Sequence, residues 1–198
     1  MELQIVRMTE LNEPQRKRAI ELFVEGFISI FNPISKDKAK LAELFGDALD
    51  SEMAIACLDG EQVVGMLSCG NSQKQPIDLQ KKSCLRVLGK FKGTLVYLLA
   101  RPMLLKPKVT DPKEGYLDYL TTDPALRGRG VATKLMTGGG AFFPYERFSF
   151  EVLEKNETAI RLYKKMGCEV VKVKRDPFAW VVGQGRPIIM RQPPPELP

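Results

Sequence analysis

The chain has 198 residues, 44% of them hydrophobic and 27% charged, with a formal net charge of +6 and no histidine. This length favours one globular domain, which we place at residues 1–191, followed by a flexible proline-rich tail at 192–198. The lack of histidine excludes Ser-His-Asp and Cys-His catalysis and histidine metal sites. The sequence begins without a signal-peptide pattern, and its longest apolar run, 94–105, is far below the roughly 20 residues that span a bilayer, so we expect a cytoplasmic protein.

The N-terminal part of the sequence predicts a strand, two helices and a β-hairpin. Apolar residues recur at helical spacing in two stretches, which Asn32-Pro33 separates. Further on, two apolar runs flank Asp59-Gly60, which is typical of a tight hairpin turn. The expected elements are a strand at Leu3–Met8, helices at Pro14–Phe31 and from Ser35 through Leu44 to a stop near Gly46, and hairpin strands at 53–58 and 62–70.

The C-terminal part predicts four further strands and two helices. The first helix follows Gly130, but the three glycines at 138–140 should make it short or frayed, since they cost on the order of 3 kcal/mol relative to alanine. The second helix begins at the N-cap residue Asn156 and stops at Gly167. The whole order predicts an α/β (α+β) fold with a mixed, mostly antiparallel sheet flanked by helices, whose later strands are Tyr116–Thr122, Phe148–Leu153, Val170–Lys174 and Pro187–Arg191.

A basic, glycine-rich loop follows the predicted strand at Tyr116–Thr122. Gly128 and Gly130 allow a tight turn and close approach of a ligand, and the free N-H groups at the start of the next helix can bind a phosphate. Arg127 and Arg129 add matching positive charge. The spacing fits neither a Rossmann motif, which needs a third glycine, nor a Walker loop, which needs Gly-Lys-Ser/Thr. A basic turn that merely caps a helix is the simpler alternative.

The segment from Arg127 to Ala132 resembles the coenzyme A pyrophosphate loop of the GCN5-related N-acetyltransferase (GNAT) family. In that loop Gln or Arg is followed by two free positions, Gly, one free position, and Gly or Ala. A second segment is similar to the same family, because Asn156 and Tyr163 lie about two helical turns apart and so face the same side. The family usually has an aromatic residue where this chain has Cys168. The resemblance implies the acyl-CoA N-acyltransferase fold over nearly the whole chain.

The resemblance further implies an N-acetyltransferase that transfers acetyl from acetyl-CoA to a primary amine by direct attack, without a metal. Tyr163 is the expected acid that protonates the leaving thiolate, and Asp118 is the candidate base, with Glu114 and Asp123 as alternatives. A structural ion pair between Asp118 and a lysine is an equally good interpretation. The residues expected to bind the coenzyme are Leu120, Thr121 and Thr122 at the pantetheine arm, Arg127, Gly128, Arg129, Gly130, Val131, Ala132 and Thr133 at the pyrophosphate, and Asn156 and Tyr163 along the arm.

The segment at 71–115 is a long insertion relative to the family pattern, and it carries most of the positive charge. Between Lys74 and Lys108 the sequence has nine Lys or Arg and one acid, Asp78. Three roles stay open: walling the acceptor site and attracting an acidic amine, binding an anionic membrane surface, or covering the sheet as a solvated helix. The apolar residues, which have the spacing of one amphipathic helical pattern, are Leu85, Leu88, Phe91, Leu95, Leu98 and Leu99.

Two other functions also stay open. A non-catalytic acyl-CoA sensor would keep the loop without the acid, and a membrane-surface protein would act through the insertion. We expect a small-molecule or peptide amine as acceptor, with an acidic one as an option, and either a monomer or a homodimer. The basic segment has few aromatic residues, so no nucleic-acid partner is expected, and a membrane is not the favoured partner. The cysteines form no CxxC pair and predict no metal site, and Cys84 is the one whose basic setting favours reactivity.

Overall fold

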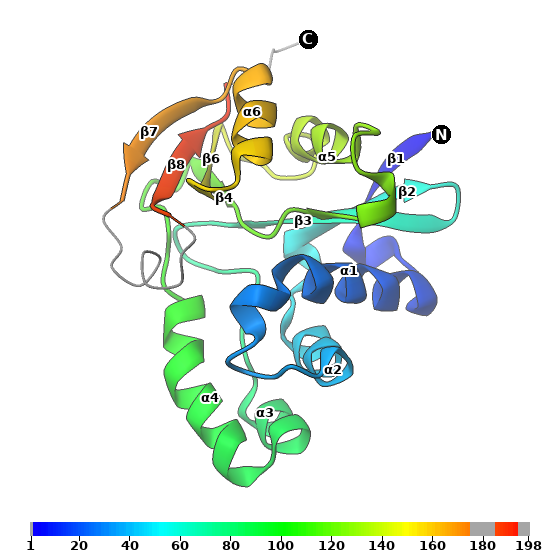
Figure 1. The fold of residues 1–198 in the computed structure, drawn as a ribbon, viewed down its shortest axis with the longest axis vertical. Coiled ribbons are helices and arrows are strands. Elements are labelled where there is room, and N and C mark those ends of the chain that lie inside the picture. The colour runs from blue at the N-terminus through cyan, green and yellow to red at the C-terminus, as the bar shows by residue number, and fades with distance from the viewer. Residues whose placement is uncertain (1, 175–184, 194–198) are drawn as a thin grey trace.

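The computed structural model describes residues 2–174 and 185–193. Its centre is an eight-stranded sheet in the order β1-β2-β3-β4-β6-β8-β7, with β5 paired to β3 (Figure 1). The paired strands are antiparallel except β4 and β6, which run parallel, and this is the mixed, mostly antiparallel sheet that the sequence predicts. The strands are β1 (Leu3–Arg7), β2 (Ala54–Asp59), β3 (Gln62–Gly70), β4 (Glu114–Leu117), β5 (Thr121–Thr122), β6 (Arg147–Leu153), β7 (Glu169–Val173) and β8 (Pro187–Arg191).

Helices lie on both faces of the sheet. Figure 1 shows α1 and α2 on one side of β3, and α5 and α6 on the other. A further pair, α3 and α4, extends from the side of α1 and α2 away from the sheet. The helices are α1 (Glu13–Phe31), α2 (Lys38–Ala48), α3 (Lys81–Leu88), α4 (Lys90–Leu104), α5 (Val131–Gly139) and α6 (Glu157–Lys165).

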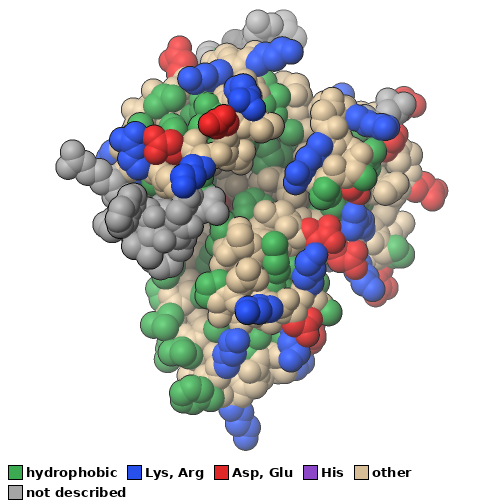
Figure 2. Space-filling model, in the orientation of Figure 1, with side chains coloured by type: hydrophobic (Ala, Val, Ile, Leu, Met, Phe, Trp, Pro, Cys, Tyr) green, Lys and Arg blue, Asp and Glu red, His purple; other side chains and the backbone are tan. Residues whose placement is uncertain are grey.

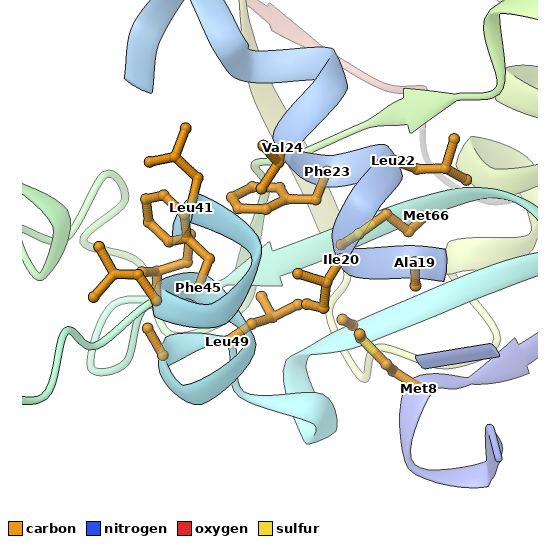
Figure 3. Close-up of a cluster of buried hydrophobic side chains, with 14 of the residues drawn as sticks. Met8, Ala19, Ile20, Leu22, Phe23, Val24, Leu41, Phe45, Leu49 and Met66 are labelled. Carbon is orange, nitrogen blue, oxygen red and sulfur yellow. The ribbon is translucent and has the colours of Figure 1, made fainter. Parts of the chain in front are cut away.

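Strand β3 contributes side chains to two separate cores. Because successive side chains of a strand point to opposite faces, Met66 belongs to the core under α1 and α2, and Leu67 to the core under α5 and α6. The first core centres on Phe23, whose ring centroid lies 5.3 Å from that of Phe45 and 5.1 Å from that of Tyr119 (Figure 3). The alternation along β3 therefore fixes which helices cover which face.

Three predicted boundaries in the N-terminal part are displaced by one to three residues. Helix α2 begins after Asp37 rather than at Ser35, because the Asp37 carboxylate accepts hydrogen bonds from the first free N-H groups of the helix. Helix α2 also continues past Gly46 to Ala48, so this glycine does not end the helix. An added Cβ at Gly46 would meet nothing within 4 Å. In the hairpin, Asp59 pairs with Gln62, which places the two turn residues one position later than expected.

The predicted strand at Tyr116–Thr122 is wrong in its middle, where residues 118–120 leave the ladder between β4 and β5. The N-H groups of Asp118 and Asp123 both donate to backbone oxygens of β3, at 2.9 and 2.8 Å. Residues that face the same neighbour in a regular strand lie an even number of positions apart, whereas these two lie an odd number apart. The segment therefore holds one extra residue, as in a β-bulge.

The insertion forms two helices where the sequence predicts one amphipathic pattern. They are separated at Gly89, whose φ of 82° is a conformation that favours glycine. Helix α3 packs on α2, with Arg86 paired to acidic residues there. Helix α4 packs on α3 at Gly93, where an added Cβ would lie 2.3 Å from the Cys84 carbonyl oxygen. The two helices thus form a compact pair that is attached to α2.

Helix α5 ends among the glycines at 138–140, as predicted. Its close contact with the sheet depends on another glycine, Gly65 of β3. A Cβ there would lie 2.8 Å from the carbonyl oxygen of Thr121 and 2.8 Å from Cγ1 of Val131. Since Val131 is the first residue of α5, Gly65 sets how closely the start of this helix approaches β3 and β5.

We expect Gly65→Ala to lower the free energy of unfolding by about 1–3 kcal/mol, because its Cβ has to displace backbone. Urea denaturation measures this change. Gly46→Ala is the matched control, since that helical position has open space around it, and it should leave stability unchanged or raise it by roughly 0.5–1 kcal/mol. Equal stability of Gly65→Ala and the parent protein would show that α5 can move off the sheet at no cost.

Candidate active site

The basic loop between β5 and α5 is held at its start by Asp123. The Asp123 carboxylate accepts hydrogen bonds from the Ala125 amide at 2.9 Å and from the Arg18 guanidinium at 2.8 Å. The hydrogen bond from the Ala125 N-H group has the largest effect on the pKa of the Asp123 carboxyl and lowers it. The hydrogen bond from Arg18 lowers this pKa further, and together the two outweigh burial, which acts in the opposite direction. A carboxylate stabilised in this way is a poor base, so Asp123 positions the loop on α1.

Beyond Asp123 and the short turn at Pro124–Leu126, the chain bends at two glycines. Gly128 has a φ of 78° and Gly130 a φ of 83°, both in the left-handed region that favours glycine. An added Cβ at either position would meet nothing within 4 Å, so the space outside the loop is open. Gly130 is also the N-cap of α5 and has no side chain that could satisfy the first N-H groups of the helix.

These first N-H groups make up an anion site. The N-H groups of Gly128, of Gly130 and of residues 131–133 make no hydrogen bond within the described residues. The Arg129 N-H group donates to the Leu126 carbonyl at 3.3 Å, and within α5 the first N-H group with a partner is that of Lys134, which donates to the Gly130 carbonyl at 2.8 Å. The predicted cations of this loop, Arg127 and Arg129, are exposed beside it. Free amides at a helix N-terminus, with positive charge close by, can bind a phosphate.

A narrow cleft opens where β4 and β6 stop pairing. The two strands run parallel up to Leu117 and Phe150, after which the chain turns from β4 toward β5, which pairs with β3. The predicted site residues Asp118, Leu120 and Tyr163 all lie at this cleft. Its volume is about 20 Å³, and the residues that line it are Leu67, Leu117, Asp118, Leu120, Met136, Phe150, Glu151 and Tyr163.

A larger cavity, of about 550 Å³, lies between β1 and α5. Volume alone would favour it as the binding site. However, it contains none of the residues predicted to bind or react, and Glu2 and Lys134 are the charged residues on its wall. We therefore place the candidate chemistry at the smaller cleft, which is lined by titratable side chains and by Met136 of α5, the helix that follows the anion-binding loop.

Tyr163 reaches the cleft from α6. Its ring packs against that of Phe150, with 4.5 Å between the centroids, and 9% of the residue is exposed. Burial raises the pKa of the Tyr163 hydroxyl to about 12, so the group keeps its proton at neutral pH. Among the residues that the structure describes, none forms a hydrogen bond with this hydroxyl. Tyr163 lines the cleft, and its hydroxyl has no competing hydrogen-bond partner there among the described residues.

Asn156 stands at the start of α6, as predicted. Its side-chain oxygen accepts a hydrogen bond from the Ala159 amide at 3.2 Å, which satisfies one free N-H group of the helix. The residue is exposed, and the side-chain NH2 group of the amide is left to meet a ligand. The helix stops as expected before Gly167, whose φ is 79°.

The backbone beside the cleft is hydrogen-bonded to β3 at residues 121–122, whereas the N-H group of Leu120 has no backbone partner among the described residues. Thr121 and Thr122 pair with β3, and the Thr121 hydroxyl donates to the Leu22 carbonyl of α1 at 3.2 Å. The Thr121 side chain thus holds α1 and is turned away from the cleft. Leu120 lies at the cleft, and its N-H group makes no backbone hydrogen bond in the described part of the chain. This N-H group is free for a ligand.

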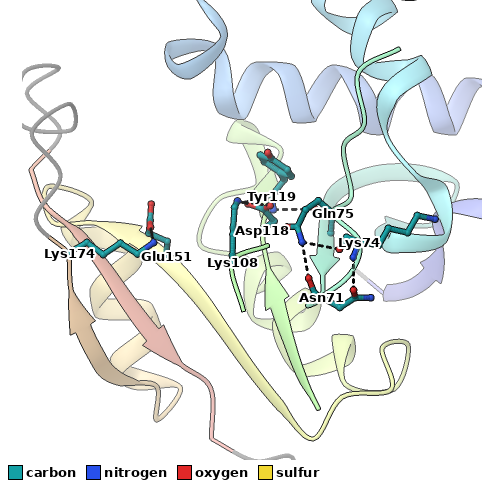
Figure 4. A network of polar contacts seen from close by, with 9 residues as sticks. Asn71, Lys74, Gln75, Lys108, Asp118, Tyr119, Glu151 and Lys174 are labelled. Atoms are coloured by element: carbon teal, nitrogen blue, oxygen red, sulfur yellow. Dashed lines mark hydrogen bonds and ion pairs between the residues drawn. The ribbon is translucent and has the colours of Figure 1, made fainter. Parts of the chain in front are cut away.

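Asp118 forms the ion pair with a lysine of the insertion. Lys108 donates to both carboxylate oxygens, at 2.6 and 2.7 Å, and 10% of the Asp118 side chain is exposed (Figure 4). Burial raises the pKa of the Asp118 carboxyl, and Lys108 offsets part of that rise. The Lys108 ammonium also lies 5.1 Å from the ring centroid of Tyr116 and 5.5 Å from that of Tyr119. The insertion therefore reaches the cleft through Lys108.

Glu151 is a second carboxylate at the cleft, and the sequence analysis missed it. Its side chain pairs with Lys174 at 2.9 Å (Figure 4), and its charge contributes to the raised pKa of Asp118. The alternation of side chains along the predicted strand could have identified Glu151 from the sequence. Since Phe150 faces Tyr163, the next residue points to the opposite face, where Asp118 lies.

The structure corrects two hypotheses about reactive residues. Glu114 begins β4, at the far end from Asp118; it accepts a hydrogen bond from Ser149 and does not line the cleft. Cys84 is fully buried, and burial raises the pKa of its thiol, so its surroundings do not favour the reactivity that its basic sequence neighbours suggested. The described residues contain no group of three or more Cys, Asp and Glu that could bind a metal ion.

Comparisons with solved structures identify the fold. An N-acetyltransferase from Staphylococcus aureus has a TM-score of 0.61 at 16% identity and covers 95% of this chain and 99% of its own. A histone acetyltransferase HPA2 and related acetyltransferase from Corynebacterium glutamicum has a TM-score of 0.61 at 18% identity, covering 100% and 99%. A GNAT acetyltransferase from Bacillus cereus has a TM-score of 0.58 at 11% identity, covering 97% of each chain. These identities are low, so the likeness shows the fold alone.

The comparison with family models assigns the sequence itself. No curated protein matches the sequence. Every helix in the described ranges is too short or too polar to cross a membrane. The model of the acetyltransferase (GNAT) family matches residues 16–168, which include the loop, the cleft and Tyr163. This match covers most of the chain, and the protein therefore belongs to the acetyltransferase (GNAT) family.

Proposed function

We propose that the protein transfers the acetyl group of acetyl-CoA to a primary amine by direct attack. Membership of the family supports an acyltransferase, and the acetyl donor and the amine acceptor are the specific proposal. One observation carries it. The helix whose first N-H groups are free, α5, also supplies Met136 to the lining of the cleft that contains Asp118 and Tyr163.

The loop residues fit the pyrophosphate of a coenzyme. The N-H groups of Gly128, Gly130 and residues 131–133 would donate to phosphate oxygens, and Arg127 and Arg129 would balance the charge. The open space at both glycines leaves room for those oxygens. The cleft, at about 20 Å³, has room for about one water molecule, so the pantetheine arm would lie along its mouth and widen it, accepting from the free Leu120 N-H group as an added strand would.

Tyr163 would act as the acid. When bound, the thioester supplies an activated acyl group, so the protein has to position the amine and move protons. As the amine attacks the carbonyl carbon, the bond to sulfur breaks and the sulfur takes up negative charge. The Tyr163 hydroxyl, which is protonated and faces the cleft, would give its proton to that sulfur.

Asp118 would act as the base. It lies at the cleft, and burial raises the pKa of its carboxyl, which makes it a stronger base than an exposed aspartate. Lys108 would keep the carboxylate oriented through its two hydrogen bonds. Proton transfer from the incoming amine to Asp118 would leave the amine nitrogen with the lone pair that attacks.

An acyl-CoA sensor of the same fold is the second candidate. Both functions require coenzyme binding, so calorimetry alone does not separate them. The protonated, unpartnered Tyr163 hydroxyl in the cleft favours catalysis. Release of free coenzyme thiol in the presence of a panel of amines tests the choice. A sensor would bind acetyl-CoA and release thiol no faster with amines than without them.

Replacing Gly130 with Glu should abolish acetyl-CoA binding in calorimetry, since the new carboxylate would occupy the phosphate position and repel it. Gly89→Glu is the matched control, because Gly89 has nearly the same φ, 82° against 83°, and equally open surroundings. It should suffer similar backbone strain and keep the coenzyme affinity. Unchanged affinity in Gly130→Glu would rule out this loop as the pyrophosphate site.

Tyr163→Phe should lower kcat by about 10- to 1,000-fold with little change in coenzyme affinity, because it removes a proton donor but keeps the ring. Steady-state kinetics with an accepted amine measure the effect. Tyr145→Phe is the control, since that hydroxyl bonds to Asn71 at 2.9 Å and lies outside the cleft lining. Full turnover in Tyr163→Phe would eliminate Tyr163 as the acid.

Lys108→Met should raise the pKa of Asp118 further, because it removes the charge that offsets burial. Carbon-13 NMR titration of the Asp118 carboxyl measures the shift. The folded protein would then hold this proton more tightly than the unfolded chain does. Stability should therefore fall as pH rises from the unfolded carboxyl value, about 3.9, through the folded value. The acid limb of kcat/KM should move to higher pH in the same variant.

Lys113→Met is the control for this experiment, because it also removes a lysine that is paired with a carboxylate, Glu146, but in an exposed position. It should leave the Asp118 titration and the pH profile of kcat/KM unchanged. If Lys108→Met shifts the NMR titration and leaves the pH profile in place, Asp118 is not the base.

A further inference from the structure

Helix α4 presents a largely apolar outer face. Five large side chains, spaced over three helical turns, point away from the protein and are between 49% and 87% exposed. Figure 2 shows hydrophobic side chains gathered at the lower left, over α4 as placed in Figure 1. Soluble proteins expose such residues singly more often than as a continuous stripe. The residues of this outer stripe are Phe91, Leu95, Leu98, Leu99 and Met103.

The inner face of the same helix is apolar as well. Gly93 lies against the backbone of α3, and Val96, Tyr97, Ala100 and Leu104 pack against the core under α1 and α2. An amphipathic helix on a protein surface needs one apolar face, whereas a helix with apolar residues all round has contacts on both sides. The inner face of α4 is therefore covered by the protein itself, and the outer stripe is left exposed to an apolar partner, either a lipid bilayer or another protein.

The charged residues of α3 and α4 are all basic. No Asp or Glu occurs between residues 79 and 110, which include α3 and α4. At 100° per residue, Lys90 and Arg101 flank one edge of the stripe, and Lys92 lies near the other edge, between the directions of Leu99 and Met103. Arg101 is paired with Asp78, but Lys90 and Lys92 form no ion pair with any described residue. Two exposed lysines of α3, Lys81 and Lys82, add to the same surface.

We propose that α4 docks on an anionic membrane surface, with the outer stripe in the acyl boundary and the lysines at the headgroups. An apolar helical face with basic flanks has the chemistry that binds anionic lipid in the plane of the interface. The shape agrees, because α4 protrudes at one end of the molecule (Figure 1). This inference is independent of the proposed acetyl transfer.

The observations favour lipid over a protein partner. Protein interfaces contain about one hydrogen bond per 100–200 Å², and the outer stripe offers no side-chain donor or acceptor for one. A second copy of the chain is disfavoured for another reason. A symmetric pair joined through α4 would bring the stripe's basic flanks together, without an acidic residue in the helix pair to offset the repulsion.

Vesicle flotation tests the proposal. The full chain should float with vesicles of equimolar phosphatidylcholine and phosphatidylserine, and should stay in the aqueous fraction with vesicles of phosphatidylcholine alone. Added salt should weaken the binding. The triple variant Phe91→Ser, Leu98→Ser and Leu99→Ser should lose flotation at low salt. These side chains are exposed, so circular dichroism should find the fold intact.

A charge variant separates attraction from insertion. Lys90→Gln with Lys92→Gln should weaken partitioning by about fivefold per lysine. Arg16→Gln with Lys17→Gln removes the same charge from exposed positions on α1, outside the α3–α4 pair, and should have little effect. In Phe91→Trp, tryptophan emission should shift to the blue on the mixed vesicles, as expected for a side chain that enters the acyl boundary.

Three results would overturn the proposal. One is no flotation with the anionic vesicles at low salt. Another is flotation that the serine variant retains, since binding would then not involve the stripe. The third is a dimer in light scattering that the serine variant converts to a monomer, with no vesicle binding in either form, which would assign the stripe to an interface between copies.

Discussion

The candidate site depends on one extra residue between β4 and β5. At this bulge the Tyr119 N-H group donates a hydrogen bond to the Ser68 hydroxyl at 3.2 Å. The Tyr119 ring packs in the aromatic core around Phe23. The backbone on one side of the bulge stays with β6, and on the other side it pairs with β3. The cleft, the free Leu120 N-H group and the position of Asp118 all follow from this division. A regular strand would have closed the gap that the proposed chemistry needs.

Local chemistry explains why the sequence was a good guide to the loop and the helix caps. A left-handed glycine, an N-cap asparagine or a helix-stopping glycine acts within a few residues, so Gly130, Asn156 and Gly167 could be placed from the sequence. The bulge could not be placed in this way, because the run at Tyr116–Thr122 is continuously strand-like and its partner, Ser68, is far away along the chain. The basic residues next to Cys84 in the sequence were a poor guide to its surroundings for a related reason. Its sequence neighbours are basic, but a helix turns adjacent residues to different sides.

Helical periodicity identified the apolar residues of the insertion without indicating which of them meet the protein. Helix α4 has two apolar faces, and the close contact at Gly93 decides which one packs inward. Charge is divided in a similar way. Some basic residues of the insertion are used internally, such as Arg86 on α2 and Lys108 on Asp118, and a smaller set remains for a partner. Net charge along a segment therefore overstates the charge that its surface presents.

The insertion leaves the sheet at Gly70 and returns at Tyr116, and these two residues are paired neighbours in β3 and β4. In folding terms, this pairing closes a long loop, whose entropic cost grows only with the logarithm of its length. The α3–α4 pair forms its contacts within the loop, over short sequence separations, and such contacts form quickly. Once that pair is folded, the ends that remain to be joined are short tethers. A long and highly charged segment can therefore sit next to the bulge with little effect on how readily the central strands find their register.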